Sequence, residues 1–337
     1  MAVLSVLDLS PIRQGDTAAD ALRNSLDLAR HVERLGFGRY WVAEHHNMSG
    51  IASAATAVVI GHIAQGTSHM RIGAGGIMLP NHAPLIIAEQ FGTLESLFPG
   101  RIDLGLGRAP GTDQITAQAL RRTLQGGEDR FPQDVQELMA LFAPAEPGQR
   151  VRAVPGAGLD IPIWILGSSL FGAQLAAMLG LPFAFASHFA PDQMAMAIHL
   201  YRSRFQPSAR LASSYLMVGY NLIAADTDDE AQFVASSMHR VWLNRMLGLD
   251  PRLGPPVADF EASLTDQERG LHQRRAFRGA IGSKATIARE LAAFIAETGA
   301  DEVMINTMTY DHEARKKSYA ITADAFGMGA KVSPSAA

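Results

Sequence analysis

Residues 3–9 read VLSVLDL, and the chain continues with TAAD at positions 17–20 before a run of regularly spaced apolar residues. The first run is almost wholly apolar, which is typical of a parallel strand buried on both faces. The TAAD pattern predicts a helix start, in which Thr17 caps the backbone three residues on. Apolar residues then recur every three or four positions from 22 to 32, and Gly36 ends the pattern. This segment is therefore predicted to be one strand followed by one helix.

The same strand-then-helix pattern recurs along the chain. Further strands are predicted at residues 39–43, 71–78, 102–106, 162–166, 183–187, 215–225 and 302–306. Helices are predicted at residues 53–65, 83–98, 132–142, 169–179, 191–205, 228–247, 284–298 and 312–326. Eight such units indicate the α/β class and a closed (β/α)8 TIM barrel, with a doubly wound open sheet as the alternative. No linker interrupts them, so residues 1–330 are expected to form a single domain and residues 331–337 a frayed tail.

Two connections are too long for a minimal barrel. They are residues 109–130, after the fourth strand, and residues 248–282, before the last strand–helix unit. Connections longer than about 15 residues are often functional. The second insertion either decorates the barrel or forms a mobile lid over the strand ends, and the sequence leaves both readings open.

Composition excludes several classes of protein. The 337 residues are 47% apolar and 18% charged, and the formal net charge is -4. That balance argues against disorder and against a nucleic-acid partner. There is no cysteine, which excludes disulfides, thiolate metal sites and a cysteine nucleophile. No apolar run is long enough to span a membrane, and the expected location is the cytoplasm.

Barrel enzymes carry their chemistry at the carboxyl ends of the strands. The second predicted strand ends in Glu44-His45-His46. Adjacent residues on an extended segment point to opposite sides, so no metal site is expected there. One histidine is expected to act as an acid, base or hydrogen-bond donor, oriented by the other histidine or by Glu44. A purely structural polar cluster is the alternative.

The third and fourth strands end in glycine-rich segments. Consecutive glycines at Gly75-Gly76 predict a bulge, or a place where a flat ligand lies directly on the backbone. Arg108 follows the fourth strand, where it could clamp a phosphate or pair with a carboxylate such as Asp103 or Asp113.

The fifth and sixth strands bring further polar groups to the same rim. Ser168 and Ser169 precede a helix, whose free N–H groups favour an anion. Either serine could instead be a simple helix cap. Ser187 and His188 follow the sixth strand.

Taken together, these segments resemble the bacterial luciferase-like family of flavin-dependent monooxygenases. The segments are WVAEHH at residues 41–46, GGIMLP at 75–80, PGRIDLGLGR at 99–108 and LGSS at 166–169. The resemblance extends over nearly the whole chain, and is closest to single-chain members of unassigned substrate.

That resemblance implies an FMN site at the mouth of the barrel. The flavin ring would lie against a cis peptide between Gly75 and Gly76, and His45 would be the catalytic histidine. The residues implied for the phosphate are Arg108, Ser168, Ser169 and the backbone of Gly172. Ser187 and His188 would line the ring or the substrate. Luciferase proper has a reactive cysteine where this chain has Gly107, which argues against light emission.

The implied reaction is two-component monooxygenation of a small organic substrate. A separate flavin reductase would supply reduced FMN, which would react with O₂ through a flavin C4a-hydroperoxide. Hydride transfer with a deazaflavin and a non-catalytic flavin-binding protein are the alternatives. The resemblance also implies a homodimer, formed through the second and third helices.

Overall fold

The computed structural model describes residues 2–109, 114–120 and 130–328. The strands are β1 (Val3–Asp8), β2 (Arg39–Val42), β3 (Arg71–Met78), β4 (Ile102–Gly107), β5 (Ile163–Gly167), β6 (Phe183–Phe185), β7 (Leu216–Ala224), β8 (Gly279–Gly282) and β9 (Glu302–Asn306). The helices are α1 (Ala18–Leu35), α2 (Thr56–Gln65), α3 (Pro84–Leu97), α4 (Gln114–Leu120), α5 (Phe131–Phe142), α6 (Leu170–Leu179), α7 (Met194–Arg204), α8 (Asp228–Met246), α9 (Asp266–Gln273), α10 (Lys284–Thr298) and α11 (His312–Ala325), with a short 3-10 helix η1 (Leu79–Asn81).

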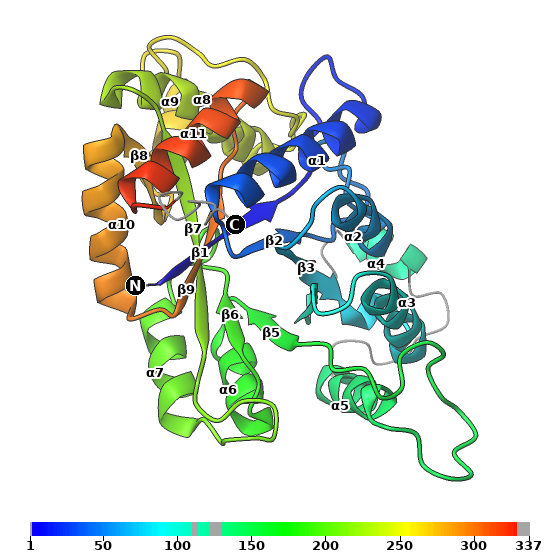
Figure 1. Cartoon of the computed structure of the whole chain (residues 1–337). Coiled ribbons are helices and arrows are strands. Elements are labelled where there is room, and N and C mark those ends of the chain that lie inside the picture. The colour runs from blue at the N-terminus through cyan, green and yellow to red at the C-terminus, as the bar shows by residue number, and fades with distance from the viewer. Residues whose placement is uncertain (1, 110–113, 121–129, 329–337) are drawn as a thin grey trace, which may run out of the picture.

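The strands close into a barrel with the helices outside it (Figure 1). All pairings are parallel, and they run from β1 through β7, then to β9 and back to β1. The predicted TIM barrel is therefore confirmed, and the open sheet is excluded. The helix start at Thr17 is also as predicted, because its side chain accepts from the Asp20 N–H and Gly36 ends the helix at φ 88°.

Eight strands were predicted from the sequence, and β8 was missed. β7 pairs with β6 through Leu216–Val218 and with β8 through residues 221–224, so β8 joins the sheet beside the carboxyl half of β7. Both β8 and α9 lie within the predicted insertion at 248–282. α4 lies within the insertion at 109–130, which is otherwise largely outside the described residues.

Apolar side chains form two layers. The larger core lies between the sheet and the helices, where strand residues such as Val6 and Ile72 are fully buried. A smaller cluster fills the inside of the barrel, around Leu7, Trp41 and Trp164. The two indole rings meet edge to face, with centroids 5.2 Å apart.

A buried ionic network closes the amino-terminal end of the barrel. Arg39 donates to Asp103 (Nη1–Oδ2, 2.6 Å) and to Glu302 (Nε–Oε2, 3.1 Å). Asp103 also pairs with Arg71 at 2.7 Å, and the Tyr215 hydroxyl donates to Glu302 at 3.0 Å. Both carboxylates are fully buried, and their compensation by guanidinium groups makes this burial tolerable. We call these five residues the floor; they place the open end at the carboxyl ends of the strands.

Candidate functional site

The segments that follow the strands meet at the open end of the barrel, as parallel strands require. Glu44 follows β2, and its buried carboxylate organises the neighbouring side chains. His46 and His82 each place Nε2 close to the same oxygen, Glu44 Oε1, at 2.7 and 2.9 Å. The Met78 N–H donates to Oε2 at 2.9 Å, and the Asn81 amide donates to Oε1 at 3.3 Å. These bonds lower the pKa of Glu44 from 4.5 to about 2, against the opposing effect of its burial.

Glu44 therefore does not orient His45, one of the two arrangements that the sequence left open; it holds His46 and His82 instead. Among the described residues, the ligand atoms of these three side chains lie within 4.8 Å of one another, close enough to share a cation. The two histidine nitrogens also lie at hydrogen-bond distance from Glu44 Oε1, so the three side chains form one polar cluster.

His45 and His188 form a different arrangement. The Nδ1 atom of each ring is buried and has no hydrogen-bond partner within the part of the chain that the structure describes. Burial, and then the positive charge of Arg245 in the last turn of α8, lower the pKa of His45 from 6.5 to about 4. The pKa of His188 is also lowered to about 4, by burial and then by its proximity to His45. Two neutral imidazoles therefore lie near each other at the mouth.

Ser187 is tied to the barrel wall. β6 ends at Phe185, two residues earlier than predicted, because the Ser187 N–H turns back to the Phe185 carbonyl. The Ser187 hydroxyl is fully buried and donates to Gly219 O on β7 at 2.6 Å. The His188 ring packs on the same glycine, since an added Cβ at Gly219 would lie 2.1 Å from His188 Nδ1.

The glycines of β3 form the expected irregularity. The peptide bond between Gly75 and Gly76 is cis, as the resemblance implied. The pairing of β3 with β4 shifts register between Ala74 and Ile77, so the bulge is confirmed. A Cβ at Gly76 would lie 2.7 Å from Gly105 O, which leaves no room for a side chain.

Arg108 lies over the ring of Phe171, with the guanidinium carbon 4.3 Å from the ring centroid. No carboxylate of the described residues pairs with it, and Asp103 belongs to the floor. Asp113, the other predicted partner, lies outside the described residues.

The start of α6 lies beside Arg108. Ser169 is the helix cap, yet its side chain makes no capping hydrogen bond. At this end Gln193 Oε1 accepts from the Leu170 N–H at 3.3 Å. Gly172 packs against Gly167, where an added Cβ would meet the Gly167 Cα at 3.3 Å. Free N–H groups, two serines and an arginine thus converge on one place, a combination suited to an anion.

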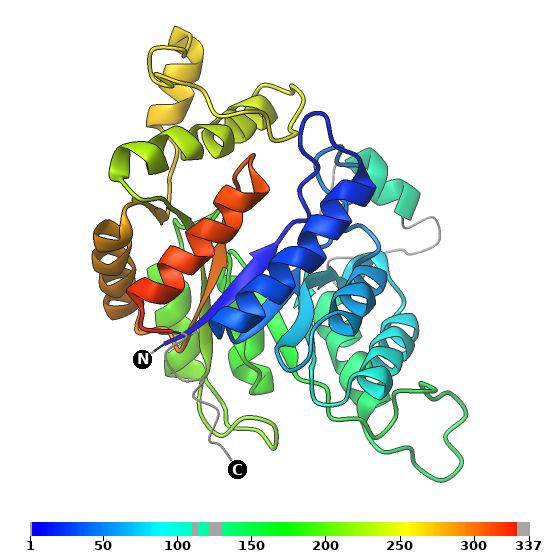
Figure 2. The same cartoon turned by 45° about the horizontal axis from the view of Figure 1, so that its top comes forward.

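The first part of the insertion at 248–282 crosses toward the loop after β1 (Figure 2). The Gln14 N–H donates to Leu253 O at 2.7 Å, and Leu253 is buried. Gly50 packs against Pro251. This segment therefore contacts the loops that follow β1 and β2; a mobile cover over the strand ends stays a prediction.

A comparison with known proteins identifies the family. Residues 3–302 match the family model described as luciferase-like monooxygenase. A protein of Escherichia coli (strain K12) named luciferase-like monooxygenase is 52% identical over 320 residues, covering 95% of this chain and 96% of the relative. The chain belongs to the luciferase-like monooxygenase family. The resemblance read from the sequence is confirmed.

Solved structures agree with this assignment to the luciferase-like monooxygenases. The structure of apo-MsnO8 has a TM-score of 0.91 and 33% identity, covering 97% of this chain and 99% of that chain. The oxygenating constituent of 3,6-diketocamphane monooxygenase, from the CAM plasmid of Pseudomonas putida, has a TM-score of 0.71 at 16% identity and covers 99% of each chain. The second likeness shows the shared fold.

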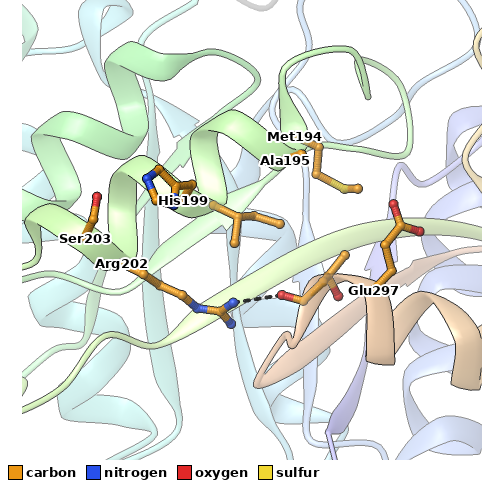
Figure 3. A pocket seen from close by; sticks show the side chains of 8 residues that line it. Met194, Ala195, His199, Arg202, Ser203 and Glu297 are labelled. Atoms are coloured by element: carbon orange, nitrogen blue, oxygen red, sulfur yellow. Dashed lines mark hydrogen bonds between the residues drawn. The ribbon is translucent and has the colours of Figure 1, made fainter.

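One hollow of this luciferase-like monooxygenase lies far from the mouth. It has a volume of about 500 Å³ and lies between α7 and α10 (Figure 3). Arg202 on its wall donates to the carbonyl oxygens of Thr298, at 2.9 Å, and Gly299. These groups end α10 at the amino-terminal side of the barrel, so the arginine serves as a helix cap.

Sequence reasoning missed His82 and Arg245. His82 follows η1 after β3, so it obeys the same strand-end rule that selected His45, and that rule could have found it. Arg245 could not be found this way, because it belongs to the last turn of α8 and nothing in its own segment indicates that it lies near His45 after β2. No helix of the described residues is long and apolar enough to cross a membrane.

Proposed function

We propose that this luciferase-like monooxygenase binds FMN at the open end of its barrel and oxygenates a small organic substrate. The observation that carries the proposal is the start of α6, where the Ser169 side chain makes no capping hydrogen bond, beside Arg108, a cation without a carboxylate partner among the described residues. A phosphate monoester fits such a place, because it offers several acceptor oxygens to N–H donors and to a guanidinium.

The residues that would hold the flavin follow from this anchor. Arg108, Ser168, Ser169 and the Gly172 N–H would bind the phosphate, and the ring would lie on the bare backbone at Gly75 and Gly76. The diketocamphane monooxygenase constituent, which shares the fold, is described in complex with FMN. His188 would border the ring or the substrate. Ser187, whose hydroxyl donates to Gly219 O on β7, would line the same pocket as part of the barrel wall.

Bound reduced FMN would supply the electrons that activate O₂. The protein would contribute orientation and proton handling. His45 is neutral at physiological pH because its pKa lies near 4. A neutral imidazole offers one N–H donor and one acceptor nitrogen, so it can hold a hydrogen bond to the reacting oxygen or pass a proton to it. The Glu44 cluster would fix the loop on which His45 stands.

Single-turnover experiments with alternative coenzymes test the proposal. Protein mixed with reduced FMN and O₂ is expected to form a long-lived oxygenated flavin absorbance. The matched arm uses a reduced deazaflavin without O₂, because an F420-dependent secondary alcohol dehydrogenase shares this fold at a TM-score of 0.64. Turnover in the deazaflavin arm alone would replace monooxygenation by hydride transfer. Tight binding of oxidised FMN with no oxygenated species would indicate a non-catalytic flavin-binding protein.

The variant His45→Ala separates binding from chemistry. Product formation is expected to fall far more than FMN affinity, because His45 is placed at the reacting end and the phosphate at the other. Arg108→Gln is the matched comparison, since it should weaken FMN binding first. Unchanged turnover in His45→Ala would remove this residue from the mechanism.

Partners are part of the same proposal. A separate reductase would deliver reduced FMN, and the cysteine-free chain suits the reducing cytoplasm. We also propose a homodimer through α2 and α3, which expose Val58 (73%), Ile86 (47%) and Leu97 (64%). Sedimentation of the wild type and of Val58→Glu tests this, and a wild-type monomer at micromolar concentration would refute it.

A further inference from the structure

A second hollow, of about 410 Å³, lies beside β8 and outside the site described above. Its walls are α8, the end of α9, β8 and α10. The side chains that matter are those of His239, His272, Arg275, Phe277 and Glu290.

Arg275 is the unusual group in this hollow. It is partly buried, and its guanidinium lies 5.0 Å from the Trp242 ring centroid and 5.2 Å from that of Phe277. Among the described residues, its guanidinium makes one hydrogen bond, from Nη1 to His239 Nδ1 at 3.0 Å. No carboxylate of the described residues pairs with it, whereas the buried Arg315 pairs with Asp8. A partly buried cation without a counter-ion is costly, so this arrangement favours an anion.

The two imidazoles beside Arg275 are uncharged donors and acceptors. The pKa of His239 is lowered to about 3, by burial and then by the charge of Arg275. Because His239 Nδ1 accepts from the arginine, its proton lies on Nε2. The rings of His239 and His272 meet edge to face at 4.9 Å. Among the described residues, His272 Nδ1 is buried without a hydrogen-bond partner, while Nε2 of the same ring lies 3.4 Å from Glu261 Oε1.

We propose that this hollow binds a small organic carboxylate. The free nitrogens of the Arg275 guanidinium would bind the carboxylate, and the Nε2–H of His239 would donate a further hydrogen bond to it. Phe277 gives an apolar wall for the rest of the molecule. A single charge is specified because Arg275 is the one cation among the described residues that line the hollow, and Glu290, which pairs with Arg289 at 3.0 Å, adds a negative charge to the same wall. A phosphate dianion would meet that repulsion with too little compensation.

A titration with benzoate tests the proposal without any flavin. Calorimetry of the wild type is compared with Arg275→Gln, which removes the charge. Arg274→Gln is the matched control, because the neighbouring arginine is exposed and the same charge is lost. We expect Arg275→Gln to weaken benzoate at least about tenfold and Arg274→Gln to leave the affinity within about twofold. Benzamide, the neutral analogue, should bind at least about tenfold more weakly than benzoate.

Histidine NMR of the wild type locates the ligand even if Arg275→Gln folds poorly. Benzoate is expected to shift the ring resonances of His239 and His272 and to leave those of His45 unchanged. Equal affinity in Arg275→Gln, shifts confined to His45, or no saturable binding at millimolar concentration would overturn the proposal. Preference for inorganic phosphate over benzoate would overturn the carboxylate assignment.

Discussion

Glu44→Gln should reveal how strongly the polar cluster at the mouth stabilises the fold. Glu44 is 1% exposed, and its pKa is lowered from 4.5 to about 2 by bonds to His46, His82 and the Met78 N–H. At about 1.36 kcal/mol per pH unit, the difference between those values corresponds to an upper limit of about 3 kcal/mol of stability at neutral pH. Glutamine keeps the size of the side chain and removes its charge.

The pH dependence gives the sign of the effect. A carboxyl group whose folded pKa is depressed stabilises the fold above its unfolded pKa, and this stabilisation is lost as pH falls through the folded value. The gap between wild type and Glu44→Gln is therefore expected to be largest near neutral pH. It should begin to shrink at about pH 4.5 and continue to fall toward about pH 2.

Urea unfolding of the flavin-free protein, followed by tryptophan fluorescence at several pH values, measures this gap. Glu313→Gln is the control, because Glu313 is 76% exposed in its pair with Lys316 and should matter little. A gap that stays constant from neutral pH down to about pH 3.5 would mean that Glu44 acts through packing alone. A gap below about 0.5 kcal/mol at neutral pH would also refute the reasoning.

Three further outcomes follow from the geometry. Gly76→Ala should destabilise the fold by about 1–3 kcal/mol, because its Cβ would lie 2.7 Å from Gly105 O; a thermal midpoint equal to wild type would contradict this. Tyr215→Phe should cost about 1 kcal/mol in urea unfolding by removing the donor to Glu302, and a stabilised variant would count against the floor as described. The rate of product formation should show no His45 titration between about pH 6 and 8, since the pKa of His45 lies near 4, and an inflection lost in His45→Ala would disprove this assignment.

The barrel could be predicted from the sequence because each strand–helix unit carries its own signals. The apolar run at residues 3–9, the cap at Thr17 and the terminating Gly36 all act within a few residues of one another. β8 was not predicted, because its four residues, Gly279–Gly282, include two glycines and show no alternation of polar and apolar side chains. α9 is almost entirely polar, although the capping box at Thr265 and Glu268 was a usable signal.

The candidate site was predictable to the extent that it depends on strand ends. Position along the strands placed His45, Arg108 and the glycine pair at one rim. It could not show that Glu44 holds His46 and His82, because that choice depends on side-chain directions after the strand has ended. The Arg275 hollow was equally hidden, since it brings together residues from four separate elements.

The floor of the barrel has a consequence for the entry and exit of small molecules. Arg39, Asp103 and Glu302 block the axis, and the indoles of Trp41 and Trp164 fill the space near them. A barrel closed at its amino-terminal end is open at the carboxyl ends of its strands. In the proposed reaction, this open end would admit the coenzyme and the organic substrate and release the product. The segment around Leu253, which forms a β-bridge with Arg13, lies beside it. The order of binding and release would then depend on which molecule obstructs the opening for the others.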